Sequence, residues 1–279
     1  MNVRLSLILA SLILLTSSLL IAQEARMTPE LLWSLGRVSP LGISTDGASV
    51  IYSVSTPNIQ EGTSKKELFS IPVAGGDATM ISSTDGLLAE PKSTSEGIFK
   101  LSHKRVKLDD VLGSEHYPDL PKSNVKIYDE LHYRHWDTWN DGAYNHVFLH
   151  QKTEDGWDEG IDIMKGQPYH TPTVPFGGTE DYIIAADGSA VYYVTKTKKG
   201  TDYVLSTNTD IYRYDIESGE TQNLTDFNEG YDTHPALSPS GQELAWLSMP
   251  RDGYEADKND LWVQEGDHRV NLTGAWDGT

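Results

Sequence analysis

The stretch that decides the fold is a short pattern near the C-terminus that also occurs earlier in the chain. Residues 231–247 read YDTHPALSPSGQELAWL, in which a polar turn (SPSG) leads into an alternating run that ends in LAWL. The strand-like piece LWV follows at 261–263, and the unit closes with NLT at 271–273. Upstream, the pieces ADG, VYYV and IYRY precede a second NLT at 223–225, 48 residues before the first. A period of about 40–50 residues with several strands per unit is typical of β-propeller blades.

Turn and strand signals extend this pattern toward the N-terminus. Residues 44–81 contain an STDG turn, two strand-like runs, a Gly-Gly hairpin and a short return strand, which together predict one blade. Residues 85–106 have only a weak strand signal and lack a Ser-Pro-Asp-Gly-like turn. The turn glycines Gly47 and Gly188 are 141 residues apart, close to three periods. Two degenerate blades, the first of them shortened, are therefore expected between them.

These observations predict an all-β fold, a partial β-propeller of about five blade-like units over residues 38–279. An irregular insertion is expected at about 107–176, where the blade pattern is interrupted by loops and an aromatic, charged segment. Two clearer blades are predicted at 177–229 and 230–273. The chain ends at Thr279 as a further blade is due to begin, so the ring is expected to be incomplete, with exposed strand edges.

The N-terminal segment predicts export from the cytoplasm. Arg4 precedes an apolar run from Leu5 to about Ala22, which is typical of a cleaved signal peptide over residues 1–22. An uncleaved anchor is the alternative, because the run approaches the length of a membrane span. Residues 23–37 are then expected to form a linker and a short helix, with Thr28 as its N-cap and Gly36 as its C-terminal stop. A periplasmic or secreted location follows.

Composition narrows the classes of partner. The chain has no cysteine, so its stability does not rely on disulfides. A formal net charge of −19 disfavours nucleic acid and anionic membrane surfaces as partners. Contact with a membrane is expected only if the signal segment is not cleaved. The sequence leaves the oligomeric state open.

Three features together resemble the N-terminal propeller of the prolyl oligopeptidase family. They are the TPELLW segment at 28–33, the Ser-Pro-x-Gly turns with NLT closures, and the segment KIYDELHYRHWDTW at 126–139. The last segment is similar to secreted bacterial dipeptidyl-peptidases and acylaminoacyl-peptidases of that family. The resemblance covers about residues 28–279, and it implies WD40-like or TolB-like repeats.

The resemblance also implies a function. In this family a propeller precedes an α/β-hydrolase domain, whose nucleophilic serine lies in a Gly-x-Ser-x-Gly elbow. No such elbow occurs in this chain, so no catalytic residue is carried over, and the chain alone is expected to be inactive. The implied role is a substrate-gating propeller of a secreted serine exopeptidase, with a peptide as the partner. The alternative is a non-catalytic periplasmic propeller that acts as a binding module.

An aromatic cluster within the insertion is the best candidate for a substrate-binding surface. Aromatic walls with a few charges suit a peptide-binding cavity. The alternative is a structural insertion that packs on blade edges. The candidate residues are Tyr133, Arg134, Trp136, Asp137 and Trp139.

Other patterns are better explained without ligands. Four histidines raise the question of a zinc site, but their spacing is not that of a zinc motif, and hydrogen-bonded histidines are the preferred interpretation. The acidic stretches at 155–159 and 252–260 do not match a calcium-binding loop. The neighbouring carboxylates at 129–130 do not by themselves indicate glycoside hydrolysis. No metal or cofactor is therefore expected. The four histidines are His132, His135, His146 and His150.

Overall fold

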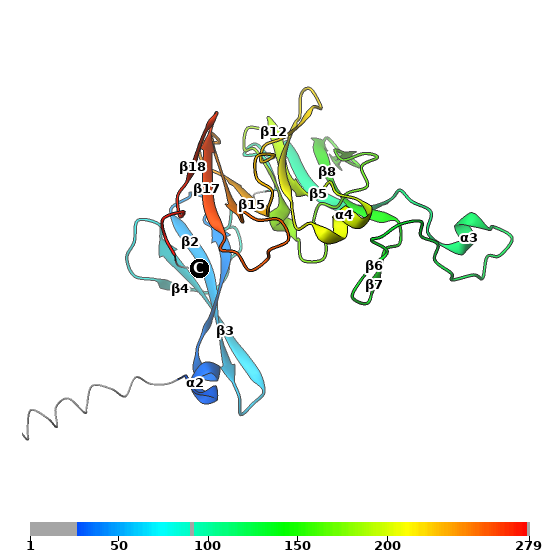
Figure 1. The fold of residues 1–279 in the computed structure, drawn as a ribbon. Coiled ribbons are helices and arrows are strands. Elements are labelled where there is room, and N and C mark those ends of the chain that lie inside the picture. The colour runs from blue at the N-terminus through cyan, green and yellow to red at the C-terminus, as the bar shows by residue number, and fades with distance from the viewer. Residues whose placement is uncertain (1–26, 90–91, 278–279) are drawn as a thin grey trace, which may run out of the picture. The chain divides into compact units, whose positions relative to one another are not determined.

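The computed structural model describes residues 27–89 and 92–277, and the predicted signal segment at 1–22 lies outside these ranges. The chain divides between Ala89 and Glu90 into two compact units. Both are built almost entirely from antiparallel sheets, with a few short helices (Figure 1). No helix in the described ranges has the length and apolar character needed to cross a bilayer.

The first unit is one four-stranded antiparallel sheet preceded by a short helix. The strands lie in the order β1-β2-β3-β4, and they confirm the blade predicted at 44–81, including its Gly-Gly hairpin. β2 and β3 pair along ten residues each, so they form a long ribbon (Figure 1). The elements are α2 (Pro29–Ser34), β1 (Arg37–Ile43), β2 (Ser49–Asn58), β3 (Thr63–Pro72) and β4 (Thr79–Ile81).

The N-terminal helix begins as predicted but ends differently. The Thr28 hydroxyl oxygen accepts a hydrogen bond from the Leu31 N–H at 3.1 Å and caps α2. The helix ends at an extended Leu35, and Gly36 is not a left-handed stop. An ideal Cβ at Gly36 would lie 2.7 Å from Cγ1 of Val54. Gly36 is therefore required by its close packing on β2, and the prediction of a glycine stop is wrong.

The second unit contains three four-stranded sheets, which correspond to propeller blades. In the described part of the chain, no strand pairing closes the sheets into a ring. The first sheet comprises β5 (Phe99–Lys107), β8 (Ala143–Thr153), β9 (Gly156–Trp157) and β10 (Ile161–Asp162). The second comprises β11 (Tyr182–Ile184), β12 (Ala190–Thr195), β13 (Asp210–Asp215) and β14 (Thr221–Asn223), with the 3₁₀ turn η1 (Thr179–Asp181) before it. The third comprises β15 (Asp232–Leu237), β16 (Glu243–Ser248), β17 (Asp260–Glu265) and β18 (His268–Asn271).

All four sheets open with the same turn, and the sequence reading missed one of them. A glycine with positive φ donates its N–H to the carbonyl three residues earlier, at 2.8–2.9 Å; these glycines are Gly47, Gly97, Gly188 and Gly241. At Gly97 the turn reads Thr-Ser-Glu-Gly, and the Thr94 hydroxyl accepts from the two N–H groups that follow the glycine. The strand after it, β5, has nine residues although its sequence signal is weak, and it belongs to a four-stranded sheet in the place of the blade expected to be shortened. One four-stranded sheet follows that of the first unit before Gly188, in place of the two blades expected, which makes four such sheets in the described residues.

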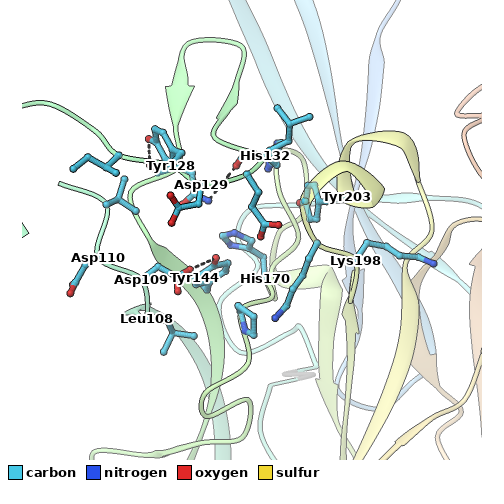
Figure 2. A pocket seen from close by; sticks show the side chains of 18 of the residues that line it. Leu108, Asp109, Asp110, Tyr128, Asp129, His132, Tyr144, His170, Lys198 and Tyr203 are labelled. Atoms are coloured by element: carbon cyan, nitrogen blue, oxygen red, sulfur yellow. Dashed lines mark hydrogen bonds between the residues drawn. The ribbon is translucent and has the colours of Figure 1, made fainter. Parts of the chain in front are cut away.

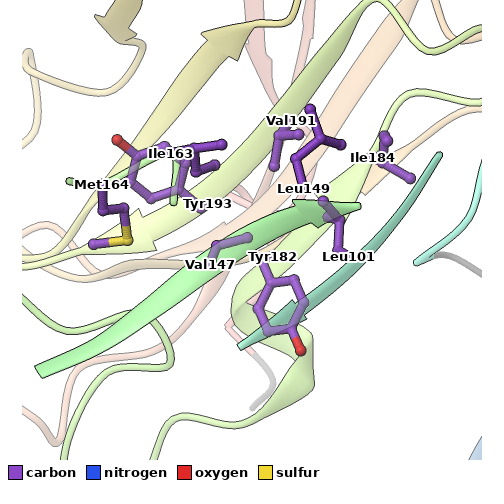
Figure 3. Packing of buried hydrophobic residues seen from close by; sticks show 9 residues of the cluster. All are labelled: Leu101, Val147, Leu149, Ile163, Met164, Tyr182, Ile184, Val191 and Tyr193. Carbon is purple, nitrogen blue, oxygen red and sulfur yellow. The ribbon is translucent and has the colours of Figure 1, made fainter. Parts of the chain in front are cut away.

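The apolar core of the second unit lies between its sheets. Alternate residues of β12 enter different clusters, because successive side chains of a strand point to opposite faces. Val191 and Tyr193 pack against Val147 and Leu149 of β8 (Figure 3). Val194 packs on the other face with residues of β13 and β16. The middle sheet is therefore covered on both faces, which explains the continuous apolar run VYYV.

Candidate functional site

The candidate site is built on a long insertion between two paired strands, β5 and β8. Residues 108–142 leave the sheet at the end of β5 and return at the start of β8. The N–H groups of Leu108 and Asp109 donate to the Gly142 carbonyl oxygen at 2.9 and 3.1 Å. An ideal Cβ at Gly142 would lie 1.9 Å from the Asp109 carbonyl oxygen, and its φ is +76°. Only glycine fits this crossing, which fixes the two ends of the insertion together.

A one-turn helix, α3 (Gly113–His116), strengthens this base. The Glu115 carboxylate accepts hydrogen bonds from the N–H groups of Val111 and Leu112, each at 2.7 Å. It also pairs with Lys107 at the end of β5, with 2.8 Å between Nζ and Oε1. The hydrogen bond from Lys107, together with those from the two N–H groups, lowers the pKa of Glu115 to about 2. The insertion is thereby linked to β5 by an ionised carboxylate.

The predicted binding residues lie on a two-stranded hairpin within the insertion. The Tyr133 and Trp139 rings stack at 6.1 Å between centroids, and the Arg134 guanidinium lies 5.3 Å from the Trp139 ring. The Trp136 ring is 66 % exposed, and its backbone has a positive φ of 50° at the turn. The hairpin consists of β6 (Arg134–His135) and β7 (Thr138–Trp139). It presents an exposed aromatic surface that also carries positive charge.

A cavity of about 530 Å³ lies between one side of this hairpin and later segments of the second unit. This volume is in the range of sites that bind small ligands. Its walls combine tyrosine, tryptophan and histidine rings with aliphatic side chains and with charges of both signs. The insertion contributes Tyr133, Arg134 and Trp136, and the later segments contribute Lys196, Tyr203, Tyr231 and Glu255.

The wall of this cavity depends on a stack between the insertion and a short helix, α4 (Gly200–Leu205). The rings of His132 and Tyr203 stack with 4.5 Å between centroids. The Lys196 ammonium donates to the carbonyl oxygens of Tyr203, at 2.6 Å, and Ser206. It also lies 4.1 Å from the Tyr203 ring centroid. Lys196 therefore holds the end of α4 and orients the ring on which His132 rests.

The charge state of this wall follows from its burial. Burial lowers the pKa of His132, and the neighbouring His135 and Lys196 lower it further. His132 therefore stacks on Tyr203 as a neutral imidazole at neutral pH. Burial also lowers the pKa of Lys196. Arg134 and Glu255 supply the other charges at this cavity, and Nε of Arg134 donates to the Trp136 carbonyl oxygen.

A second cavity, of about 510 Å³, shares His132 and Tyr203 with the first (Figure 2). The Tyr144 hydroxyl donates to Oδ2 of Asp109 at 2.7 Å, and burial is the main cause of the raised pKa of Tyr144. Burial lowers the pKa of His170 to about 4, and its Nδ1 accepts a hydrogen bond from the Asn145 N–H. The remaining lining is mixed in charge and includes Asp109, Asp110, Asp129, Glu130, Lys198 and Lys199.

The structure brings together three of the five residues that the sequence singled out. Tyr133, Arg134 and Trp136 line the 530 Å³ cavity. Trp139 supports Tyr133 from behind, and Asp137 lies at the hairpin turn and lines neither cavity. Sequence reasoning missed the opposite wall, which comprises Lys196, Tyr203, Tyr231 and Glu255. The tyrosines among them lie in no recognisable motif, so no local signal marked them.

Two of the four histidines considered for zinc, His146 and His150, use both ring nitrogens in hydrogen bonds. His146 is fully buried, and its ring nitrogens contact Oδ2 of Asp162 at 2.9 Å and the Gln167 carbonyl oxygen at 2.8 Å. The ring nitrogens of His150 are likewise used, by Ser102 and by the carbonyl oxygen of Asp158. Neither ring offers a free nitrogen to a metal. Within residues 27–89 and 92–277, no three or more His, Asp or Glu side chains are grouped to hold a metal ion.

Comparison with known proteins relates this chain to peptidases. The dipeptidyl-peptidase 5 of Porphyromonas gingivalis is 33% identical over 282 residues, an alignment that covers 86% of this chain and 41% of the relative. The dipeptidyl-peptidase 5 of Porphyromonas endodontalis is 29% identical over 279 residues, with 85% and 40% covered. The chain therefore spans about two fifths of the length of these relatives. No family model matches the chain.

Solved structures with a similar course of the chain include two archaeal peptidase structures. One is an acylaminoacyl peptidase of Pyrococcus horikoshii, with 12% identity, a TM-score of 0.44, and coverage of 87% of this chain and 40% of that one. The other is the β-propeller domain of the Trilobed protease of Pyrococcus furiosus, with 12% identity, a TM-score of 0.36, and coverage of 87% and 72%. The fold assignment for this chain rests on its own four-stranded antiparallel sheets.

Proposed function

Because the chain is homologous over most of its length to proteins named dipeptidyl-peptidase 5, we propose that it is the peptide-recognising propeller portion of a secreted serine exopeptidase. The chain contains no Gly-x-Ser-x-Gly segment, so the nucleophile belongs to residues outside it. The role of this portion is to admit and position peptide substrates. It acts in the periplasm or outside the cell, as residues 1–22 predict.

The observation that carries the proposal is the 530 Å³ cavity between the hairpin and α4. Trp136 and Tyr133 supply exposed aromatic surface on one side, and the partly buried Tyr203 and Tyr231 line the other. Aromatic side chains contribute large contact areas at a small loss of conformational entropy. The cavity is large enough for a short peptide, and it is open to one.

Charges at the two sides of the cavity match the two ends of such a peptide. The Arg134 guanidinium suits a carboxylate, which it can bind through two parallel hydrogen bonds. The Glu255 carboxylate suits an ammonium group. Lys196 takes no direct part, because its ammonium is committed to α4. Peptides with free charged ends should therefore bind more tightly than blocked ones.

Binding can be measured by calorimetry on the purified chain with tri- and tetrapeptides. Replacing Trp136 by alanine is expected to weaken binding by about 10-fold or more, because a central aromatic contact contributes about 2 kcal/mol. Trp157→Ala is the matched control, since Trp157 lines neither cavity. Equal losses in the two variants, or no binding by the parent chain, would contradict the assignment of the cavity.

The absence of catalysis in the chain itself needs a separate assay. Incubation with chromogenic dipeptidyl and acyl-amino-acid substrates is expected to give no turnover, and a serine-directed probe is expected to label nothing. Labelling of any serine would overturn this part of the proposal. A reading frame that continues beyond Thr279 into a Gly-x-Ser-x-Gly elbow would support the peptidase role, and a stop followed by an unrelated gene would favour a binding module.

A further inference from the structure

The last two sheets close with the same hydrogen-bond network, which explains the repeated NLT. In the third sheet of the second unit, Asn271 donates to Oδ2 of Asp260 at 2.9 Å and accepts from the Thr273 N–H at 3.1 Å. The Thr273 hydroxyl oxygen accepts from the Leu261 N–H at 2.8 Å. In the sheet before it, Asn223, Asp210, Thr225 and Ile211 make the same three contacts, at 3.0 Å each.

This agreement fixes the residue correspondence between the two sheets. The register pairs Trp262 with Asn271, as it pairs Tyr212 with Asn223. The turn after each closure is also the same. The Asn228 N–H donates to the Thr225 carbonyl oxygen at 3.0 Å, and the Trp276 N–H donates to the Thr273 carbonyl oxygen at 2.9 Å. At the start of the third strand of each sheet, 208 therefore corresponds to 258 and 210 to 260.

The two sheets differ at one of these positions. Residue 258 is a lysine, whose ammonium lies 2.7 Å from Oδ1 of Asp260. The same ammonium donates to the carbonyl oxygens of Thr273, at 2.8 Å, and Trp276. Lys258 thus neutralises the carboxylate and ties it to the turn that follows the closure. The corresponding residue in the preceding sheet is Asn208, which carries no charge.

The substitution leaves two buried acceptors without donors. Oδ1 of Asp210 and Oδ1 of Asn208 are inaccessible to solvent, and neither accepts a hydrogen bond from the part of the chain that the structure describes. Asp210 as a whole is 8 % exposed. Leaving such an oxygen unsatisfied is destabilising by about 1–3 kcal/mol, and more for a charged group, so buried polar atoms nearly always have a partner.

We propose that the sheet of β11–β14 binds a monovalent alkali cation beside Asp210. The cation occupies the position that corresponds to the Lys258 ammonium in the sheet of β15–β18. The ligands are Oδ1 of Asp210 and Oδ1 of Asn208, with the carbonyl oxygens of Thr225 and residue 228 as the counterparts of those that hold Lys258. Carboxylate, amide and carbonyl oxygens are the ligands that hard cations prefer. The ligand set contains one carboxylate. In the neighbouring sheet the equivalent carboxylate of Asp260 is paired with one ammonium, so a single positive charge is expected here as well.

Two other ways of satisfying Asp210 lead to different outcomes. A protonated Asp210 carboxyl could donate a hydrogen bond to Oδ1 of Asn208. Burial favours this form, because it raises the pKa of Asp210. The charge of Lys198 and the hydroxyl of Tyr212 both lower that pKa, but Oδ1 accepts a hydrogen bond from neither. If the carboxyl is protonated, the melting temperature should depend on pH and not on alkali ions. If the Lys198 ammonium instead pairs with Oδ1 of Asp210, the melting temperature should change in Lys198→Gln and should not depend on alkali ions.

The test is thermal unfolding of the full chain in sodium, potassium or tetramethylammonium chloride at equal ionic strength. Sodium or potassium is expected to raise the melting temperature by about 5 °C over tetramethylammonium at saturating concentration. Asn208→Lys is expected to abolish this difference, because its ammonium replaces the ion. Gln222→Lys, at an exposed position of the same sheet, is the charge-matched control and should keep the full response.

A reciprocal variant keeps the proposal testable if Asn208→Lys does not fold. Lys258→Asn gives the last sheet the same oxygen ligands and should roughly double the response to alkali ions. Equal melting temperatures in all three salts for the parent chain would overturn the proposal. So would an alkali response that persists in Asn208→Lys, or a dependence on Lys198→Gln or on pH alone.

Discussion

Replacing Trp246 by alanine is expected to lower the free energy of unfolding of the second unit by about 4 kcal/mol or more. Trp246 is 1 % exposed and packs in the cluster between the last two sheets. Truncating a buried tryptophan leaves a cavity, which is destabilising by about 3–5 kcal/mol. The change also removes the donor that binds Oδ1 of Asp232 at 2.9 Å, so a buried carboxylate loses a partner.

Urea unfolding followed by near-ultraviolet circular dichroism measures this loss. Trp246→Phe is an intermediate variant, because it keeps an aromatic ring in the cluster but removes the indole N–H together with part of the ring volume; its loss should lie between zero and that of Trp246→Ala. Trp262→Ala is the control, since Trp262 stacks on Trp246 but is only partly buried. If Trp246→Ala lowers the free energy of unfolding by less than about 1 kcal/mol, the cluster around Trp246 does not form the core between the last two sheets.

The second large effect concerns the pH dependence of stability. Asp232 is fully buried, and burial raises its pKa from 3.8 to about 6 despite hydrogen bonds from Ser248, Asn228 and Trp246. The folded state therefore holds a proton that the unfolded state releases more readily. The stability that this carboxyl contributes is fully present below about pH 4 and is lost as the pH rises to about 6. A shift of this size corresponds to about 3 kcal/mol.

Asp232→Asn isolates this contribution, because it removes the titration and leaves the other carboxyls in place. The difference in unfolding free energy, parent minus variant, is expected to fall by about 3 kcal/mol between pH 4 and pH 7. Any altered contact of the new amide with Asn228 adds an offset that does not vary with pH. A difference that stays flat across this range, or that rises with pH, would show that Asp232 is charged in the fold at acidic pH.

Much of the fold could be predicted from local patterns. The N-cap at Thr28, the Gly-Gly hairpin and the NLT closures each depend on contacts within a few residues or between paired strands. The Thr94–Gly97 turn does not match the Ser-Pro-Asp-Gly pattern, but a threonine hydroxyl followed three residues later by glycine accepts the hydrogen bonds that this turn needs. The geometry of the turn depends mainly on its backbone, because the turn at Gly188 begins with Ala185, which has no side-chain oxygen, so several sequences satisfy it.

The candidate site was only half predictable. The aromatic density of residues 126–139 indicated the hairpin, and the structure places three of its residues at a cavity. The opposite wall comes from Tyr203 and Tyr231, which lie far along the chain and approach only when the sheets pack. The role of Lys196 as a support of α4 was also invisible, because a lysine in sequence gives no sign of the carbonyl groups it will meet.

Hydrogen–deuterium exchange of the chain with and without a saturating short peptide tests the central claim most directly. The proposed function predicts slower exchange in two separate segments, 131–136 and 203–207, which form the two walls of the 530 Å³ cavity. Residues 49–58, in the sheet of the first unit, serve as the internal reference and should not change. Protection of both walls together would support peptide recognition at this cavity, whereas protection elsewhere alone, or none at a concentration where calorimetry shows binding, would contradict it.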